Sequence, residues 1–145
     1  MTRYLLDTNI LSNVIKPVPS EALLAWMAAQ ADEDLYIATF TIAEIWRGIL
    51  EKPAGRKRGQ LEAWFSGPEG PAALFVGRVL PFDEKAALLW AQLMADGTSR
   101  GRPRSALDTI IAAVGAANGC VVVTDNDKDF AGVDTFNPMW GKGKT

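Results

Sequence analysis

Residues 3–12, RYLLDTNILS, contain the transition that decides the fold. The short apolar run that ends at Leu6 predicts a buried strand. Apolar residues then recur at helical spacing, at Ile10, Leu11, Val14 and Ile15. Asp7 therefore stands where a strand stops and a helix begins. An acid at that position can simply begin the helix, or it can form one wall of a functional site.

The rest of the chain alternates between short apolar runs and segments with helical spacing. Further strands are predicted at residues 35–39, within 73–83, at 120–125 and within 133–140. Helices are predicted at residues 20–30, 41–52, 55–65, 84–95 and 106–119, with loops at 66–71 and 96–105. This alternation is typical of an α/β sandwich with a central, mainly parallel sheet. We expect one domain over residues 1–140 and a flexible tail at 141–145.

The composition narrows the chemistry through what is absent. A chain of 145 residues suits one domain, and its net charge of -2 gives no overall indication of nucleic-acid binding. The chain has no histidine, which excludes Ser-His and Cys-His pairs and histidine-bound zinc. Cys120 is the only cysteine, so neither an internal disulfide nor a thiolate zinc site can form. Among the remaining kinds of enzyme, one that uses carboxylates and a metal ion bound by oxygen ligands is prominent.

Targeting and membrane segments are not apparent in the sequence. The beginning of the chain lacks the long apolar core and the cleavage site of a signal peptide, and no apolar run approaches the length needed to cross a bilayer. The lone cysteine agrees with a reducing compartment. We therefore expect a soluble, cytoplasmic protein with no membrane association.

Three acids share one structural situation, although they lie far apart in the sequence. Asp7 ends the first predicted strand, Glu44 follows the strand at 35–39, and Asp108 lies in the first turn of the helix at 106–119. Parallel strands that feed helices end at the same edge of a sheet, and ligand sites form at that edge. The three carboxylates can therefore converge in space.

Two of these acids also fit a simpler interpretation as helix caps. Residues 41–44 and 105–108 both match the capping-box pattern, Ser or Thr followed three residues later by an acid. Taken alone, Glu44 looks like a solvated cap, because it falls opposite the apolar stripe of its helix. Asp108 begins a helix that is apolar or small at almost every other position. We therefore expect it to need a partner, either a cap or a cation, because burial of an unpaired charge is costly.

Converging acids repel one another and favour a divalent cation. Mg²⁺ or Mn²⁺ fits carboxylate and water ligands, and such a metal can generate hydroxide from water and stabilise charge on a phosphate oxygen. Residues 124–130, TDNDKDF, add further acids just after a buried strand. Asp and Asn in this spacing are also typical of a polar turn, and the spacing does not match an EF-hand.

Five segments together resemble the PIN-domain nucleases, most closely the VapC- and FitB-type toxins of bacterial toxin–antitoxin pairs. They are YLLDTNILS, TIAEIWRGI, ALDTIIAAVGAANG, VVVTDNDKDF and FNPMW, which occur in the family's order and span nearly the whole chain. The resemblance implies a compact PIN-like α/β/α sandwich. It also implies a Mg²⁺- or Mn²⁺-dependent endoribonuclease that hydrolyses RNA phosphodiesters.

The resemblance further implies which residues form the site. By match, Asp7, Glu44 and Asp108 are the catalytic, metal-binding triad. Many relatives have a fourth acid at the position of Asn126, so this chain departs from the fully acidic pattern there. Asp127 or Asp129 are alternatives for the fourth acid. The neighbouring residues Thr8, Asn9 and Thr124 carry hydroxyl or amide groups suited to hydrogen bonds that orient the ligands.

RNA binding requires cationic contacts, and two basic clusters adjoin the predicted site. One follows Glu44 and contains Arg47, Lys52, Arg56, Lys57 and Arg58. The other precedes Asp108 and contains Arg100, Arg102 and Arg104, which are the better candidates. Solvated surface is an equally good explanation for any single one of these charges.

The resemblance also implies partners. A VapB-like antitoxin is expected to block the nuclease, and an arginine from it can compete with the metal for the acids. A groove for it is expected near residues 10–15 and 41–52, although most of those side chains also suit the core. PIN toxins are commonly dimers, so we expect a homodimer, with Trp90, Leu93 and Met94 as candidates for either the interface or the core.

Two alternatives to the nuclease remain open from the sequence. The first is a non-catalytic PIN-like module that binds RNA or protein, in which the acids are helix caps. Metal binding distinguishes it from the nuclease. The second is a phosphatase with Asp7 as its nucleophile, but the chain lacks a second acid two residues later. We rank the phosphatase last.

Overall fold

The computed structural model describes residues 2–15, 18–126, 130 and 132–138, and it is an α/β/α sandwich. The sheet has five strands in the order β3-β2-β1-β4-β5, and every neighbouring pair is parallel. The predicted fold class is therefore confirmed. The expected tail at residues 141–145 lies outside the described residues. None of the described helices is long and apolar enough to span a bilayer.

The strands and helices follow the predicted alternation. The strands are β1 (Tyr4–Leu6), β2 (Leu35–Ala38), β3 (Val79–Leu80), β4 (Val121–Val123) and β5 (Thr135–Phe136). The helices are α1 (Thr8–Val14), α2 (Glu21–Ala28), α3 (Thr39–Leu50), α4 (Arg56–Ser66), α5 (Pro71–Leu74), α6 (Glu84–Ser99) and α7 (Ala106–Ala117), with a 3-10 turn η1 at Asp32–Asp34.

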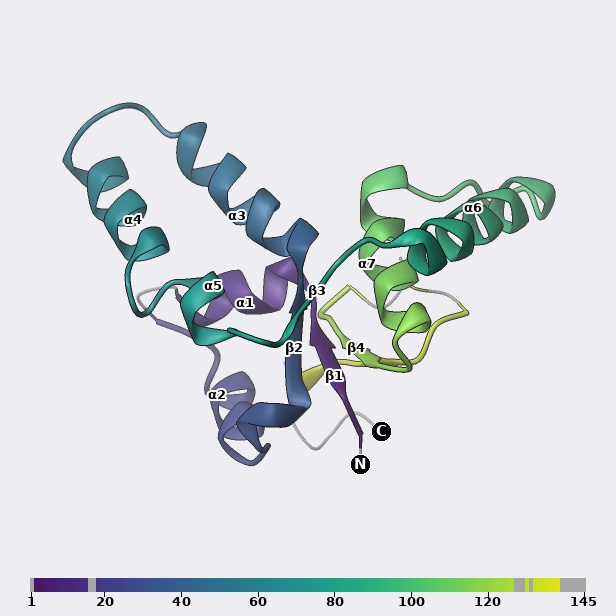
Figure 1. Ribbon diagram of the computed structural model, residues 1–145, viewed down its shortest axis with the longest axis horizontal. Helices are drawn as coiled ribbons and strands as arrows, with labels where there is room; N and C mark the ends of the chain where they lie inside the picture. The colour runs from purple at the N-terminus through teal and green to yellow at the C-terminus, as the bar shows by residue number, and fades with distance from the viewer. Residues whose placement is uncertain (1, 16–17, 127–129, 131, 139–145) are drawn as a thin grey trace.

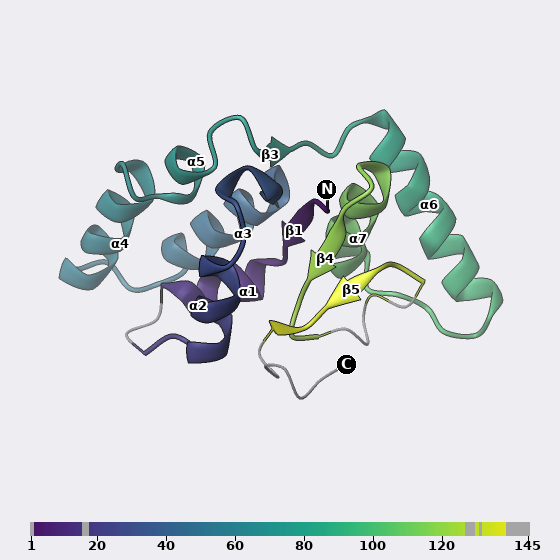
Figure 2. The ribbon, with the colours of Figure 1, turned by 90° about the horizontal axis from the view of Figure 1, so that it is seen from below.

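Side chains that alternate along the central strands build two cores, one on each face of the sheet. Leu5 and Val122 pack with α6 and α7, whereas Leu6 and Val123 pack with α1, α2 and α3. Helices α6 and α7 thus cover one face, and α1 to α5 lie on the other side (Figures 1 and 2). Both faces of β4 are buried or half-buried, which explains its unbroken run of valines.

Helix α7 ends where the sequence predicts. Asn118 is its last capping residue, and Gly119 follows with a φ of 65°, a left-handed conformation that favours glycine. The chain then turns directly into β4. This short connection sets the position of α7 against the sheet, and with it the position of Asp108.

Helix α6 differs from its predicted range of 84–95, because it continues through Ser99. The reason is a close approach of the following loop. The N–H of Arg102 donates to the Gly97 carbonyl at 2.8 Å, and a Cβ on Gly97 would lie only 2.7 Å from the Arg102 carbonyl oxygen. Gly97 therefore extends the helix into residues that look like a polar loop.

Two other segments also differ from the sequence predictions. The strand predicted within 73–83 is present as Val79–Leu80, but helix α5, which begins at Pro71, was not predicted. Helix α3 begins at Thr39, two residues before the predicted start at Thr41, directly after β2. The second difference changes the interpretation of Glu44.

We predict that Gly115→Ala destabilises the protein, although alanine normally favours a helix. An added Cβ would lie 2.7 Å from Cγ2 of the fully buried Val122, so α7 would have to move from the sheet. The expected loss in the free energy of unfolding is about 1–3 kcal/mol, measured by denaturant titration. Gly59→Ala in α4 is the matched control, because its Cβ would meet no atom within 4 Å. It should stabilise by up to about 1 kcal/mol, and equal effects of both changes would contradict the packing argument.

Candidate carboxylate site at the sheet edge

The carboxyl ends of β1, β2 and β4 meet at one edge of the parallel sheet. Asp7 directly follows β1, Thr39 begins α3 directly after β2, and Thr124 directly follows β4. Figure 1 shows α3 and α7 beginning on this same side of the sheet, on either side of the end of β1. The topology therefore brings segments from three distant parts of the chain to one edge.

Asp7 is the buried centre of this edge, with only 9 % of its surface exposed. Its Oδ1 accepts a hydrogen bond from the Thr8 N–H at 2.8 Å, which makes Asp7 the N-cap of α1. Its Oδ2 accepts from the Thr124 hydroxyl at 2.9 Å, across 117 residues of sequence. Asp7 thus begins a helix and also joins β1 to the end of β4, so the two interpretations of this acid are compatible.

Burial raises the pKa of the Asp7 carboxyl from 3.8 to about 6. The hydrogen bonds from Thr124 and Thr8 oppose this rise because they stabilise the ionised form, whereas the nearby negative charges of Glu44 and Asp125 add to it. Asp7 therefore stands among like charges at a place with little water. A cation at this edge would relieve both effects.

Glu44 is connected to Asp7 by hydrogen bonds from Thr8. The Thr8 hydroxyl donates to Glu44 Oε1 at 2.6 Å and also lies 3.0 Å from the hydroxyl of Thr41, which is fully buried. The predicted capping box at residues 41–44 is wrong, because α3 begins at Thr39 with Ala38 as its N-cap and has no acid in its first turn. Glu44 is half-buried and faces α1, so it is not a solvated cap.

Thr124 connects Asp7 to the segment after β4. Its fully buried hydroxyl donates to Asp7 and accepts from the N–H of Asn126 at 3.0 Å. The Asn126 side chain is exposed, and so is that of Asn9 on α1. Asp127 and Asp129, the alternatives for a fourth acid, lie outside the described residues.

Asp108 lies in the first turn of α7, where its N–H donates to the Ser105 hydroxyl at 3.4 Å. One half of the predicted capping box is therefore present. The Asp108 side chain is exposed, so the expectation that it is a buried acid in need of a partner is wrong. Ala106 in the same turn is exposed as well, and Leu107 is 47 % exposed.

Two hollows flank the edge. Asp108 lines a cleft of about 520 Å³ together with Arg100, Arg102 and Arg104. Glu44 lines a smaller pocket of about 220 Å³ between α1, α3 and α4. Within the residues that the structure describes, no three acidic or thiol side chains are grouped closely enough to hold a metal ion.

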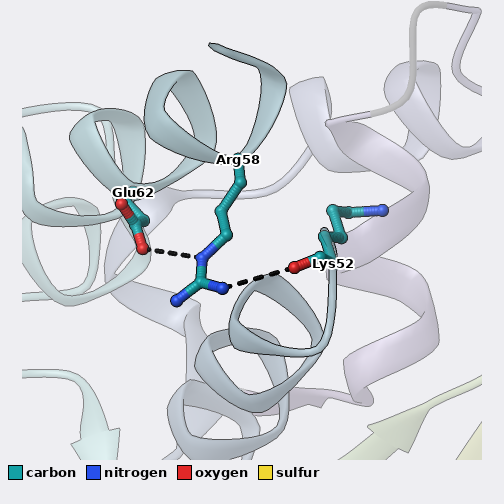
Figure 3. A network of polar contacts seen from close by, with 3 residues as sticks. All are labelled: Lys52, Arg58 and Glu62. Carbon is teal, nitrogen blue, oxygen red and sulfur yellow. Dashed lines mark hydrogen bonds and ion pairs between the residues drawn. The ribbon is translucent and has the colours of Figure 1, made fainter. Parts of the chain in front are cut away.

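The basic cluster after Glu44 is partly neutralised by its own helices. Arg47 Nε pairs with Glu51 at 3.0 Å, and Arg58 Nε pairs with Glu62 at 3.0 Å. Figure 3 shows Arg58 also donating to the Lys52 carbonyl, at 3.3 Å, so that it ties the start of α4 to the end of α3. Arg58 thus connects the two helices, whereas the exposed Arg47–Glu51 pair lies within α3 and its cap.

The comparisons with known proteins agree with the geometry. The sequence matches the PIN domain family over residues 4–135. It is 40 % identical over 135 residues to a Sinorhizobium fredii protein named VapC ribonuclease Y4jK, covering 92 % of this chain and 95 % of the relative. It is 35 % identical over 136 residues to toxin FitB of Neisseria gonorrhoeae, covering 92 % and 96 %.

The chain belongs to the PIN-domain family.

A solved structure supports the likeness of this chain to the FitB-type members of that family. The crystal structure of FitAcB from Neisseria gonorrhoeae matches this PIN domain with a TM-score of 0.86 at 34 % identity, covering 93 % of this chain and 97 % of that one. The resemblance to VapC- and FitB-type toxins is therefore confirmed. Nothing in these similarities tests the individual site residues, which remain predictions.

Several groups at this edge of the PIN domain escaped the sequence analysis. Thr41 supports the Thr8 hydroxyl. Asp125 was noted among the acids after β4, but the effect of its charge on Asp7 was not. Asp96 and Gly97 line the cleft beside Asp108 because α6 extends further than predicted. Gly97 was the sequence feature that could have indicated the close approach of the following loop to α6.

We predict that Asp7 makes the free energy of unfolding depend on pH. The folded state holds the Asp7 proton more tightly than the unfolded chain, so stability from this group falls as pH rises from about 4 to about 6 and then stays constant. The loss from this group between pH 4 and pH 7.5 is about 2–3 kcal/mol, and it is absent in Asp7→Asn. Denaturant titrations of both proteins at pH 4 and 7.5 in EDTA measure it. A difference between the two proteins that is the same at both pH values contradicts the raised pKa.

We also predict that Thr124→Val raises the pKa of Asp7 further. The change removes the hydroxyl that donates to Oδ2 and leaves a side chain of nearly the same shape. An NMR titration of the Asp7 carboxyl carbon measures the pKa. Thr124→Ser retains the donor and is the matched control, so an equal shift in both variants argues against a role for the hydroxyl.

Proposed function

We propose that this PIN domain is the toxin of a VapBC-type toxin–antitoxin pair and acts as a Mg²⁺- or Mn²⁺-dependent endoribonuclease. The observation that carries the proposal is the buried Asp7 carboxylate, which two hydrogen bonds orient beside the negative charges of Glu44 and Asp125. The names of its relatives support it, since they include VapC ribonuclease Y4jK and a tRNA(fMet)-specific endonuclease VapC from Shigella flexneri.

The donor set at the edge fits a hard divalent cation. Carboxylate oxygens are the ligands that Mg²⁺ and Mn²⁺ prefer, and Asp7 carries a raised pKa that a cation would lower. In the proposed site Asp7 and Glu44 hold the ion, and Asp108 supplies a third carboxylate from α7. When bound, the ion supplies Lewis-acid stabilisation of a phosphate oxygen and a water of lowered pKa.

The protein's own residues have separate tasks in this proposal. Thr124 and the Thr8 N–H hold the two oxygens of Asp7 in place, and the Thr8 hydroxyl holds Glu44. The hydrogen bonds to Asp7 favour its ionised form, and together these contacts hold both acids at the same edge. Arg100, Arg102 and Arg104 are the candidates for binding the RNA backbone, because they line the cleft next to Asp108.

A VapB-like antitoxin is the proposed protein partner. Similar solved structures include FitAB bound to an IR36 DNA fragment, which matches this chain with a TM-score of 0.85 at 34 % identity. The pocket between α1, α3 and α4 offers such a partner both Glu44 and apolar side chains, among them Ile15, which is 42 % exposed. An antitoxin arginine that reaches Glu44 from this pocket would compete with the cation.

A homodimer is also proposed, on the exposed apolar surface of α6 and its neighbours. Leu88 is 67 % exposed and Leu107 is 47 % exposed. Among the interface candidates from the sequence, Leu93 packs against the core, and Trp90 donates its indole N–H to the Ala106 carbonyl at 3.0 Å. Leu88 and Leu107 are therefore better placed than Leu93 to contact a second copy.

A non-catalytic RNA- or protein-binding module is the second candidate. One observation favours it: the described residues contain no group of three acidic side chains close enough to hold a metal. In that case Asp7 would serve α1 as its N-cap and Asp108 would serve α7 as a first-turn acid, and the basic loop would hold the ligand. Metal binding by the purified protein separates the two candidates.

We predict that Asp7→Asn and Asp108→Asn each lower RNA cleavage by at least about 100-fold, because each removes a metal-binding carboxylate. Cleavage of RNA by the purified proteins is measured with Mg²⁺, with Mn²⁺ and with EDTA, and circular dichroism checks the fold. Glu69→Gln is the matched control, an exposed acid in the loop before α5. Normal cleavage by either aspartate variant shows that the triad is wrong. Absence of both cleavage and calorimetric metal binding in the wild type favours the binding module.

A further inference from the structure

Thr41 is a buried polar residue in the first turn of α3 that has no task yet in the proposed metal site. Its side chain is fully buried, and its hydroxyl lies 3.0 Å from the hydroxyl of Thr8 on α1. Thr41 and Glu44 are three residues apart, so they lie on the same face of α3. That face is turned toward α1, which contacts α3 beside the ends of β1 and β2 (Figure 1). Thr8 therefore contacts both side chains.

The Thr8 hydroxyl has one proton and two possible partners. Its oxygen lies 2.6 Å from Oε1 of Glu44 and 3.0 Å from the hydroxyl oxygen of Thr41. A carboxylate oxygen can only accept, and 2.6 Å is typical of a hydroxyl that donates to a carboxylate. The Thr8 proton therefore goes to Glu44, and the Thr41 hydroxyl must donate to the Thr8 oxygen. The hydrogen bonds run in one direction, from Thr41 to Thr8 to Glu44.

The hydroxyl of Thr41 also selects one conformation of Thr8. Threonine has two common χ1 rotamers in helices, unlike valine and isoleucine, and Thr8 is the first residue of α1. The other rotamer would turn the Thr8 oxygen away from both of its partners. Within the described part of the chain, the Thr8 hydroxyl is the only side-chain donor to Glu44. Thr41 therefore stabilises the rotamer on which the contact with Glu44 depends.

The order of the hydrogen bonds also strengthens the contact with Glu44. A hydroxyl that accepts a hydrogen bond is polarised and becomes a better donor. Because Thr41 is fully buried, water does not compete for its proton. Glu44 itself is half-buried and lines the pocket between α1, α3 and α4. With Oε1 held by Thr8, its carboxylate has fewer orientations to lose when a ligand binds.

We propose that Thr41 is a positioning residue for Glu44 and acts through the hydroxyl of Thr8. Thr41 does not hold the metal ion itself, and its contribution is to keep Thr8 turned toward Glu44. The effect on metal binding rests on the nuclease function proposed above, whereas the order of the hydrogen bonds does not. Asp7 takes no part in this chain of hydroxyls, because Thr8 binds Asp7 through its backbone N–H.

The Thr8 hydroxyl proton provides a direct test, because a short, partly buried hydrogen bond slows its exchange with water. Proton NMR spectra in water and EDTA compare the wild type with Thr41→Val, which has nearly the same shape but no donor, and with Thr41→Ser, which retains the donor. Thr8→Val assigns the signal. We expect the signal in the wild type and in Thr41→Ser, and its loss or upfield shift in Thr41→Val. An unchanged signal in Thr41→Val overturns the proposal, and so does a wild type without the signal.

Mn²⁺ affinity, measured by calorimetry at pH 7.5, tests the consequence for the site. We expect Thr41→Val to weaken Mn²⁺ binding about 3- to 10-fold, less than the loss of a group that touches the ligand directly, and Thr41→Ser to stay within about twofold of the wild type. Thr39→Val is the matched control. It makes the same change in the same helix, but the exposed Thr39 has its hydroxyl 3.5 Å from the Leu80 carbonyl and not beside Thr8. Its effect should be less than about twofold.

A second background separates positioning from packing. Thr8→Val already breaks the chain of hydroxyls, so adding Thr41→Val to it should weaken Mn²⁺ binding no further. A role of Thr41 in packing alone predicts the same loss in both backgrounds and no rescue by Thr41→Ser. Circular dichroism checks that each variant folds, and the hydroxyl signal of the wild type tests the proposal without any variant of Thr41.

The results distinguish this proposal from the proposed function. A wild type that neither binds Mn²⁺ nor cuts RNA contradicts the nuclease and the effect of Thr41 on metal binding, while the hydroxyl signal still decides the order of the hydrogen bonds. A wild type that binds Mn²⁺ and cuts RNA, with a Thr41→Val variant of equal Mn²⁺ affinity, overturns the positioning role alone.

Discussion

The Asp7 carboxylate is the constraint on which the rest of the site depends. One of its oxygens caps α1 and the other receives the hydroxyl of Thr124, so a single side chain fixes the start of a helix against the end of a distant strand. A charge this buried would ordinarily be excluded from a core. It is retained here with two donors that favour its ionised form. With a pKa of about 6, Asp7 is mostly a carboxylate above that pH.

Around Asp7, hydroxyl groups connect the charges at the edge. Thr8 gives its N–H to Asp7 and its hydroxyl to Glu44, so the position of one acid is coupled to that of the other. Burial and repulsion oppose this arrangement in the folded protein without a ligand. Repulsion of this kind is relieved by any cation that binds between the acids, so the same arrangement that costs stability would favour the binding of the cation proposed above.

The parts of the fold that could be predicted are those that depend only on residues adjacent in the sequence. The apolar run before Asp7 and the Asn118–Gly119 end of α7 are local, and both are where they were expected. The start of α3, the length of α6 and the exposure of Asp108 were predicted wrongly, because each depends on a tertiary contact. Glu44 was named as a site residue through the family resemblance, but its contact with Thr8 could not be predicted, because it depends on the packing of α3 against α1.

The edge is asymmetric, and the asymmetry follows from the sheet order. Because β1 lies in the centre, α1 and α3 cover one face and α6 and α7 the other, so Asp7 stands between two differently built hollows. The hollow on the α3 side has small volume, apolar walls and Glu44, whereas the one on the α7 side has larger volume, three arginines and Asp108. A polyanion gains most from the second and an apolar peptide from the first. Ligands of these two kinds would therefore approach the edge from opposite faces of the sheet, one on the side of Glu44 and the other on the side of Asp108.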